Sequence, residues 1–216
     1  MINGISVKVC GITSAADARA AVGIGADYLG FIFYPNSPRC VSAANFDAMK
    51  SQLPVVKKVA VLVDPSMVDL AALRVMGFDF FQIHFKLNTP IVRVQEWSEV
   101  VKPATLWLVP QLPPDLDVPA ELIPLADTFL LDTYHAGKFG GTCETGDWAK
   151  FRRHQAAYPQ KNWILSGGLK PENVTAAIKA TGAKFIDVNS GVESSPGVKD
   201  HAKLQELSLV LRSGTE

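Results

Sequence analysis

The chain repeats one short pattern four times, and this repeat constrains its fold more than any other feature. In each copy a Gly or Ala beside an Asp or Lys precedes an apolar run of strand length, and the copies begin at Gly25, Gly77, Leu125 and Gly182. Their spacing of roughly 50 residues predicts structural units arranged in series. Four further runs of strand length lie between the copies, at residues 7–10, 59–63, 105–109 and 163–165. The sequence therefore predicts eight strands.

The eight runs are nearly continuous in apolar residues, which is typical of parallel strands that are buried on both faces. The segments between them have the features of helices, because Ser14 with Asp17 and Ser66 with Asp69 have the spacing of a helix-capping pair. Eight strand–helix units in a chain of 216 residues predict a closed (β/α)8 barrel, a TIM barrel of the α/β class. A doubly wound sheet is the alternative, but that fold shows no comparable quarter repeat.

One stretch departs from the pattern. Residues 110–124 contain five prolines, and proline removes a backbone donor and breaks a helix interior. We therefore expect an irregular or reduced helix after the fifth strand. A linker between two domains is the competing interpretation, but the repeat continues in step on both sides, so we expect one catalytic domain over residues 1–216.

Composition narrows the class of partner. The 21 Lys and Arg residues balance 21 Asp and Glu residues, so the basic excess that drives nucleic-acid or acidic-membrane binding is missing. A small molecule is the expected partner. Cys10, Cys40 and Cys143 are odd in number and widely spaced, which favours neither a disulfide framework nor a zinc site and suggests a reducing cytoplasm. We see no targeting segment or membrane-length apolar run.

The active site of such a barrel lies at the C-terminal ends of its strands. Cys10 ends the first strand, just before a helix expected to begin near Ser14. A positive helix end nearby would lower the pKa of this thiol and make it reactive. The alternative is that Cys10 is a small buried apolar residue, as most free cysteines are.

Asp132 ends the sixth strand after three apolar residues. A carboxylate in such a position is costly unless it is used or paired. It is either a functional acid or a capping or salt-bridged residue, and Lys8 is a candidate partner. The loop over residues 133–147 is long and contains glycine, which suits a lid over substrate as well as an ordinary surface loop.

Glycine turns follow the seventh and eighth strands, at Gly167 and Gly168 and at Ser190 and Gly191. Such turns leave backbone N–H groups uncovered, and in barrels these two loops commonly bind phosphate beside a helix N-terminus. One glycine turn alone would indicate little more than a tight bend. The two together predict a phosphate site.

With these residues assembled, the chain resembles the phosphoribosylanthranilate isomerases of tryptophan biosynthesis over nearly its whole length. The motifs occur in the family's order. They are Lys8-Val9-Cys10-Gly11-Ile12-Thr13, Gly30-Phe31-Ile32-Phe33 with Ser37-Pro38-Arg39, Gln82-Ile83-His84, Asp132 with Gly140-Gly141-Thr142, Asp147-Trp148, Ser166-Gly167-Gly168-Leu169 with Pro171-Glu172-Asn173-Val174, and Ser190-Gly191-Val192-Glu193 with Pro196-Gly197-Val198-Lys199-Asp200.

The resemblance implies an Amadori rearrangement of N-(5-phosphoribosyl)anthranilate, an aldose-to-ketose isomerisation that uses no metal and no organic cofactor. Carried over by position, Asp132 is the general acid that opens the ribose ring, and Cys10 is the general base that removes the proton next to the imine. Arg39 contacts the anthranilate carboxylate, for which a guanidinium offers paired donors. The two glycine turns hold the phosphate. A monomer or a homodimer is expected.

The chain also departs from the family pattern around the substrate pocket and the lid. Phe85 and Lys86 follow the strand-four motif where a glycine and an acid are usual, and Cys143 and Gly146 are unusual in the lid. His84 is therefore either a substrate contact or a hydrogen-bonded structural histidine. Two rivals stay open. A related isomerase of histidine biosynthesis would use an aspartate in place of the strand-one cysteine, and a catalytically lapsed barrel would not be expected to retain both catalytic groups.

Overall fold

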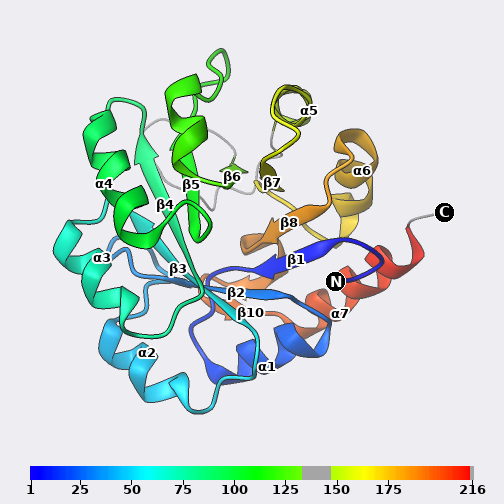
Figure 1. Ribbon diagram of the computed structural model, residues 1–216. Helices are drawn as coiled ribbons and strands as arrows, with labels where there is room; N and C mark the ends of the chain where they lie inside the picture. The colour runs from blue at the N-terminus through cyan, green and yellow to red at the C-terminus, as the bar shows by residue number, and fades with distance from the viewer. Residues whose placement is uncertain (133–146, 215–216) are drawn as a thin grey trace.

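The computed structural model describes residues 1–132 and 147–214. Within these residues eight parallel strands close into a barrel, in which each strand pairs with the next and β8 pairs with β1, and helices surround it (Figure 1). The barrel strands are β1 (Ser6–Val9), β2 (Tyr28–Ile32), β3 (Lys57–Val63), β4 (Phe80–Lys86), β5 (Leu106–Gln111), β6 (Thr128–Leu131), β7 (Asn162–Leu165) and β8 (Phe185–Val188). The expected TIM barrel is confirmed.

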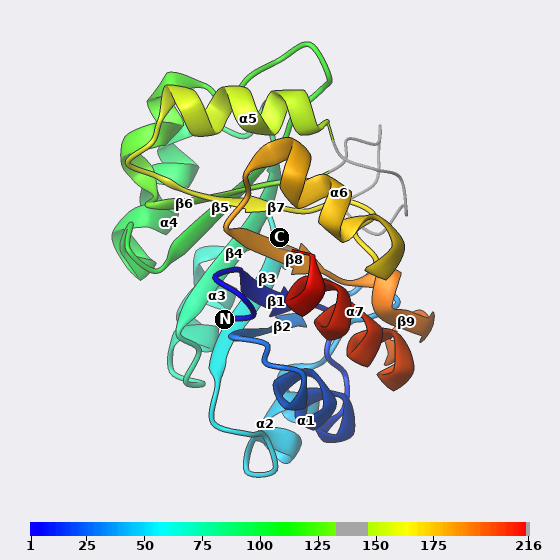
Figure 2. The ribbon, with the colours of Figure 1, turned by 90° about the vertical axis from the view of Figure 1, so that its right-hand side faces the viewer.

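Helices connect the strands, and a short hairpin follows the last strand. The α-helices are α1 (Ala15–Gly23), α2 (Ala43–Lys50), α3 (Met67–Arg74), α4 (Ile91–Val101), α5 (Trp148–Ala157), α6 (Pro171–Thr181) and α7 (His201–Ser213). Two 3-10 helices, η1 (Ala120–Leu125) and η2 (Ser190–Val192), and the hairpin strands β9 (Glu193–Ser195) and β10 (Val198–Lys199) complete the described elements. Helix α7 packs against both α1 and α6, so the C-terminal helix closes the ring of helices (Figure 2).

The repeated aspartates connect neighbouring strands. The Oδ2 atom of Asp27 accepts a hydrogen bond from the backbone N–H of Val7 at 2.9 Å, and that of Asp79 accepts one from Lys58 at 2.8 Å. In both copies, the residue just before an even-numbered strand thus binds the backbone of the preceding odd-numbered strand. This contact gives the repeat a physical reason, because it satisfies a backbone donor where two strands begin.

The predicted helix starts and the predicted irregular segment are confirmed. The Ser14 and Ser66 hydroxyls each accept a hydrogen bond at 3.1 Å, from the backbone N–H of Asp17 and Asp69 respectively. After β5 the chain forms the 3-10 helix η1 in place of an α-helix, and η1 contains Pro124. The prolines therefore shorten this unit without opening the barrel.

Aromatic side chains fill the barrel at the N-terminal ends of its strands. The ring of Tyr28 lies 4.9 Å from that of Phe185, 5.4 Å from that of Trp107 and 5.7 Å from that of Phe80, measured between ring centroids. These rings pack against the buried side chains of the barrel interior at this end. The buried polar side chains of Lys8, Gln82 and Asp187 lie farther along β1, β4 and β8, toward the C-terminal ends of the strands.

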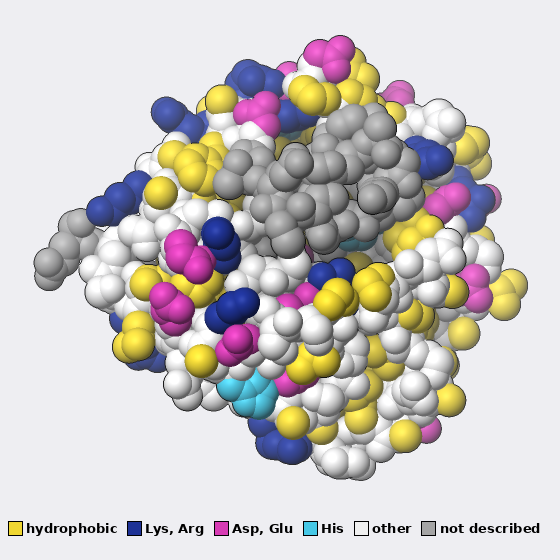
Figure 3. Space-filling view, turned by 180° about the vertical axis from the view of Figure 1, so that it is seen from behind, with side chains coloured by type: hydrophobic (Ala, Val, Ile, Leu, Met, Phe, Trp, Pro, Cys, Tyr) yellow, Lys and Arg dark blue, Asp and Glu magenta, His cyan; other side chains and the backbone are white. Residues whose placement is uncertain are grey.

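The surface carries charges of both signs. On the face that Figure 3 shows, Lys and Arg side chains are interspersed with Asp and Glu side chains and form no broad patch of one sign. Within the described residues, no helix combines the length and the apolar composition that a membrane crossing requires.

Candidate active site

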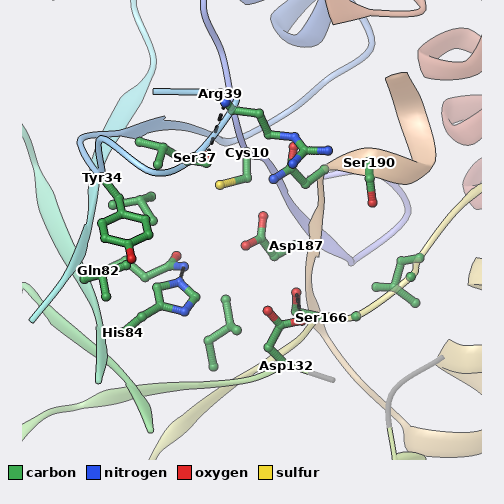
Figure 4. A pocket seen from close by; sticks show the side chains of 18 residues that line it. Cys10, Tyr34, Ser37, Arg39, Gln82, His84, Asp132, Ser166, Asp187 and Ser190 are labelled. Carbon is green, nitrogen blue, oxygen red and sulfur yellow. Dashed lines mark hydrogen bonds between the residues drawn. The ribbon is translucent and has the colours of Figure 1, made fainter. Parts of the chain in front are cut away.

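A pocket opens at the C-terminal ends of the barrel strands. Seven of the eight predicted site residues line it, namely Cys10, Arg39, His84, Asp132, Gly167, Gly168 and Ser190. In Figure 4, Cys10 and Asp132 lie on opposite sides of the cavity, with the carboxylate of Asp187 between them in this view. The structure therefore brings the two predicted proton-transfer groups to one cavity.

Cys10 follows the last residue of β1, and its side chain lies inside the barrel with 4% of its surface exposed. Burial raises the pKa of the Cys10 thiol, because a thiolate loses its hydration there, although the positive charge of Lys8 acts in the opposite direction. The expectation that a helix end lowers this pKa is therefore wrong. The low dielectric of the barrel interior outweighs the nearby positive charge.

Lys8 forms a buried ion pair with Asp187, a residue that the sequence analysis missed. The Nζ atom of Lys8 lies 2.7 Å from Oδ2 of Asp187, and the two residues are direct partners in the pairing of β1 with β8. The expectation that Lys8 pairs with Asp132 is corrected by this contact, because Asp187 occupies the strand beside Lys8. An acid inside a short apolar strand is a signal for such a pair, since buried carboxylates are rarely left uncompensated.

The ion pair leaves one carboxylate oxygen without a partner. Among the described residues, Oδ1 of Asp187 is a buried atom with no hydrogen bond, and Asp187 lines the pocket. Burial raises the pKa of the Asp187 carboxyl in spite of the Lys8 charge. A buried acceptor with no partner is costly, so this oxygen is available to a donor group of a bound molecule.

Asp132 follows the last residue of β6 and is half-buried. Its Oδ1 atom accepts a long hydrogen bond of 3.4 Å from the hydroxyl of Ser166, which follows β7. The side chain therefore enters the pocket between two neighbouring strand ends. Residues 133–146 of the predicted lid, which include Gly140, Cys143 and Gly146, lie outside the described residues.

His84 lines the pocket from β4 and makes a 2.8 Å hydrogen bond through its Nε2 atom to Nε2 of Gln82. Burial, helped by the charge of Lys8, lowers the pKa of His84 to about 3. The ring is therefore neutral at physiological pH, and with Gln82 as donor its proton lies on Nδ1. His84 combines both expected features, a structural hydrogen bond and a place in the pocket wall. Within residues 1–132 and 147–214, the Oε1 atom of Gln82 is a second buried acceptor with no hydrogen bond.

Arg39 reaches the pocket from the loop after β2, and Glu193 holds one edge of its guanidinium. The distances to the Glu193 carboxylate are 2.9 and 3.0 Å from Nε and 2.7 Å from Nη2. Lys199 binds the same carboxylate at 2.9 Å and the side-chain oxygen of Asn189 at 2.9 Å. A buried ion network thus joins Arg39 to the turn after β8. The motif containing Glu193 was visible in the sequence, but its role in holding Arg39 was not.

The predicted phosphate turns lie side by side. Gly167 and Gly168 have φ angles of 94° and 60°, a left-handed backbone conformation that residues other than glycine rarely adopt. The second turn continues into the short helix η2, which begins at Ser190. Gly191 does not line the pocket. A Cβ atom there would collide with the backbone oxygen of Leu169, so Gly191 lets the two turns touch.

Comparisons with known proteins agree with this geometry. A family model described as N-(5'phosphoribosyl)anthranilate (PRA) isomerase matches residues 7–208. The N-(5'-phosphoribosyl)anthranilate isomerase of Cellvibrio japonicus is 38% identical over 208 residues, which cover 94% of this chain and 91% of that protein.

Solved structures of the same kind of enzyme superpose closely. The phosphoribosyl anthranilate isomerase of Thermus thermophilus has a TM-score of 0.78 and 31% identity, covering 97% of this chain and 99% of that one. A phosphoribosyl anthranilate isomerase in complex with reduced 1-(o-carboxyphenylamino)-1-deoxyribulose 5-phosphate has a TM-score of 0.74 and 28% identity, with the same coverage.

Proposed function

The chain belongs to the N-(5'-phosphoribosyl)anthranilate isomerase family, and we propose that Cys10 and Asp132 carry out the two proton transfers of its reaction. It is an isomerase of tryptophan biosynthesis that converts the aldose form of its small phosphorylated substrate into the ketose form. The observation that supports the residue assignment is the position of the thiol and the carboxyl group on two sides of one pocket.

Asp132 acts first, as the general acid. Its carboxyl proton goes to the ribose ring oxygen, the bond between that oxygen and the anomeric carbon breaks, and the lone pair of the anilino nitrogen, which keeps its hydrogen, forms a protonated imine. Cys10 then acts as the general base. Its thiolate removes the proton from the sugar carbon next to the imine, which gives an enolamine that tautomerises to the ketone. Positioned acids and bases each contribute about 10²- to 10⁴-fold in rate.

The remaining pocket residues bind the substrate in our proposal. Arg39 contacts the anthranilate carboxylate with the donors that Glu193 leaves uncovered, because one edge of the guanidinium is already bound. His84 contacts the substrate as a neutral ring. The buried oxygens of Asp187 and Gln82 accept hydrogen bonds from sugar hydroxyls, which would satisfy two acceptors that have no hydrogen bond from the part of the chain that the structure describes.

The phosphate binds to the two glycine turns. Gly167, Gly168 and Ser190 line that end of the pocket, and Gly191 keeps the turns in contact. Backbone N–H groups at a short helix start, here η2, hold a dianion by charge-assisted hydrogen bonds. The departures at Phe85 and Lys86 lie at the end of β4, and we expect them to affect substrate fit more than proton transfer.

We further propose that residues 1–216 form one catalytic domain that works in the cytoplasm without a metal or an organic cofactor. We propose that the protein is a monomer or a homodimer. Cys10 and Cys40, the cysteines in the described ranges, are free thiols, which suits a reducing compartment.

The test is an assay of Cys10→Ser and Asp132→Asn with freshly made phosphoribosylanthranilate, followed by the loss of its fluorescence. Each variant should lose turnover by about 10²-fold or more while it stays folded by circular dichroism. Cys40→Ser is the matched control, because Cys40 lies outside the pocket, and it should keep normal turnover. Near-normal turnover in either site variant would reject its assigned role. The substrate of the histidine-pathway isomerase, run alongside, should not be converted.

A further inference from the structure

The side chains of Cys10 and Lys8 both lie next to Gly30 of β2, inside the barrel. They are two residues apart at the end of β1, so both side chains point inward. Across from them, β2 carries Gly30, where a Cβ atom would come within 2.9 Å of Cys10 Sγ and within 2.9 Å of Lys8 Cε. The missing side chain therefore leaves room for the thiol and the lysine stem to lie next to each other.

To act as a general base, Cys10 must be a thiolate, and its buried position disfavours that negative charge. Burial raises the pKa of the thiol, so the thiolate needs a compensating cation nearby. Lys8 is fully buried and provides that cation. Although burial alone would lower the pKa of Lys8, its neighbours Asp187 and Cys10 raise it, so the ammonium keeps its proton.

We propose that the Lys8–Asp187 ion pair sets the charge state of Cys10. Lys8 is the positioning residue that stabilises the thiolate, and Asp187 is the group that weakens this stabilisation. Asp187 holds Lys8 Nζ at 2.7 Å and keeps it directed across the barrel. Its negative charge also opposes the thiolate, so the two members of the pair act on Cys10 with opposite sign. The proposal rests on the assignment of Cys10 as the general base.

The other charged groups around Cys10 do not replace Lys8. Lys199, from β10, also favours the thiolate, but its ammonium is bound to the Glu193 carboxylate at 2.9 Å. The guanidinium of Arg39, from the loop after β2, is bound to the same carboxylate. His84, from β4, is neutral, and Asp132, after β6, is an acid that can supply no positive charge to a thiolate. Lys8 is the cation whose effect on the thiol is largest.

The test measures the titration of Cys10 directly. The rate of alkylation by iodoacetamide is recorded against pH, and the modified peptide that contains Cys10 is quantified by mass spectrometry. Lys8→Met should shift the midpoint of this titration upward by about 1–3 pH units, and Asp187→Asn should shift it downward. Cys40, in the same molecules, is the internal control, and its titration should not move. In each variant, the acid limb of the pH profile of kcat should shift in the same direction as the titration midpoint of Cys10.

The double variant Lys8→Met with Asp187→Asn guards against misfolding, because it replaces the ion pair by neutral groups of similar size. Its midpoint should lie above that of the unmodified protein and below that of Lys8→Met. Shifts of equal sign in the two single variants, or no shift in Asp187→Asn and in the double variant, would overturn the proposal. Failure of the general-base assignment has a different signature, namely normal turnover in Cys10→Ser with the thiol shifts unchanged.

Discussion

Replacing Glu193 by alanine should destabilise the protein strongly, because Glu193 neutralises two buried cations. Its carboxylate binds Arg39 through three hydrogen bonds and Lys199 through one, and the two cations are 9% and 3% exposed. Removing one partner of a buried ion pair costs about 3–5 kcal/mol. For a chain of this length, that free energy lowers the midpoint of thermal unfolding by about 6–20 °C.

The loss of stability caused by Glu193→Ala should become smaller as the pH falls. Burial alone would raise the pKa of Glu193, but its hydrogen bonds and ion pairs with Arg39 and Lys199 outweigh burial and lower the pKa below its ordinary value of 4.5. A carboxyl group whose pKa is lower in the folded state stabilises the fold above its unfolded pKa and loses that effect as pH falls through the folded value. The difference in melting temperature between the two proteins should therefore be constant near neutral pH and shrink below about pH 4.5.

Thermal unfolding followed by circular dichroism at several pH values measures both effects. Glu206→Ala is the matched control, because Glu206 is an exposed glutamate on α7, and it should change the unfolding free energy by less than about 0.5 kcal/mol. A melting temperature for Glu193→Ala equal to that of the control would refute the reasoning. So would a difference that grows as the pH falls. Because Arg39 loses its fixed position, kcat/KM should also fall by about tenfold or more.

Two further predictions concern the pocket. Gly30→Ala should reduce turnover by about 10²-fold, because its Cβ atom would displace the Cys10 thiol and the aliphatic part of Lys8. The control is Gly23→Ala, whose Cβ atom would have no atom within 4 Å and which should leave the steady-state rate unchanged. Equal rates for the two variants would contradict the packing argument. Since the pKa of His84 is about 3, His84→Gln should leave the acid limb of the pH–rate profile above pH 5 in place. A limb that moves with this substitution would show that His84 titrates above pH 5.

The barrel could be predicted from the sequence because its signals are local. A buried parallel strand needs a short apolar run, and each run is visible by itself. Asp27 and Asp79 recur because each satisfies a backbone N–H at a strand start, and Ser14 marks a helix start by its own spacing. Proline-rich residues 110–124 predicted an irregular or reduced helix, which the structure shows as the 3-10 helix η1, for the same reason, since proline acts on its own turn.

The ion pairs of the site could not be predicted because their partners are distant in sequence. Lys8 and Asp187 are 179 residues apart, and Arg39 and Glu193 are 154 residues apart. Their contacts depend on which strands lie side by side and on the register between them. The same reason explains the wrong direction expected for the pKa of Cys10, because burial inside a closed barrel depends on all eight strands together.

The most direct test of the central claim is to trap the ring-opened imine on each inactive variant. Enzyme in excess is mixed with substrate, and borohydride reduces any bound imine to a stable open-chain amine, which mass spectrometry then quantifies. Cys10→Ser should accumulate this amine in proportion to enzyme, because Asp132 still opens the ring and the next proton cannot leave. Asp132→Asn should yield no more than a protein-free sample. Equal trapping by both variants, or more by Asp132→Asn, would contradict the division of labour between the two residues.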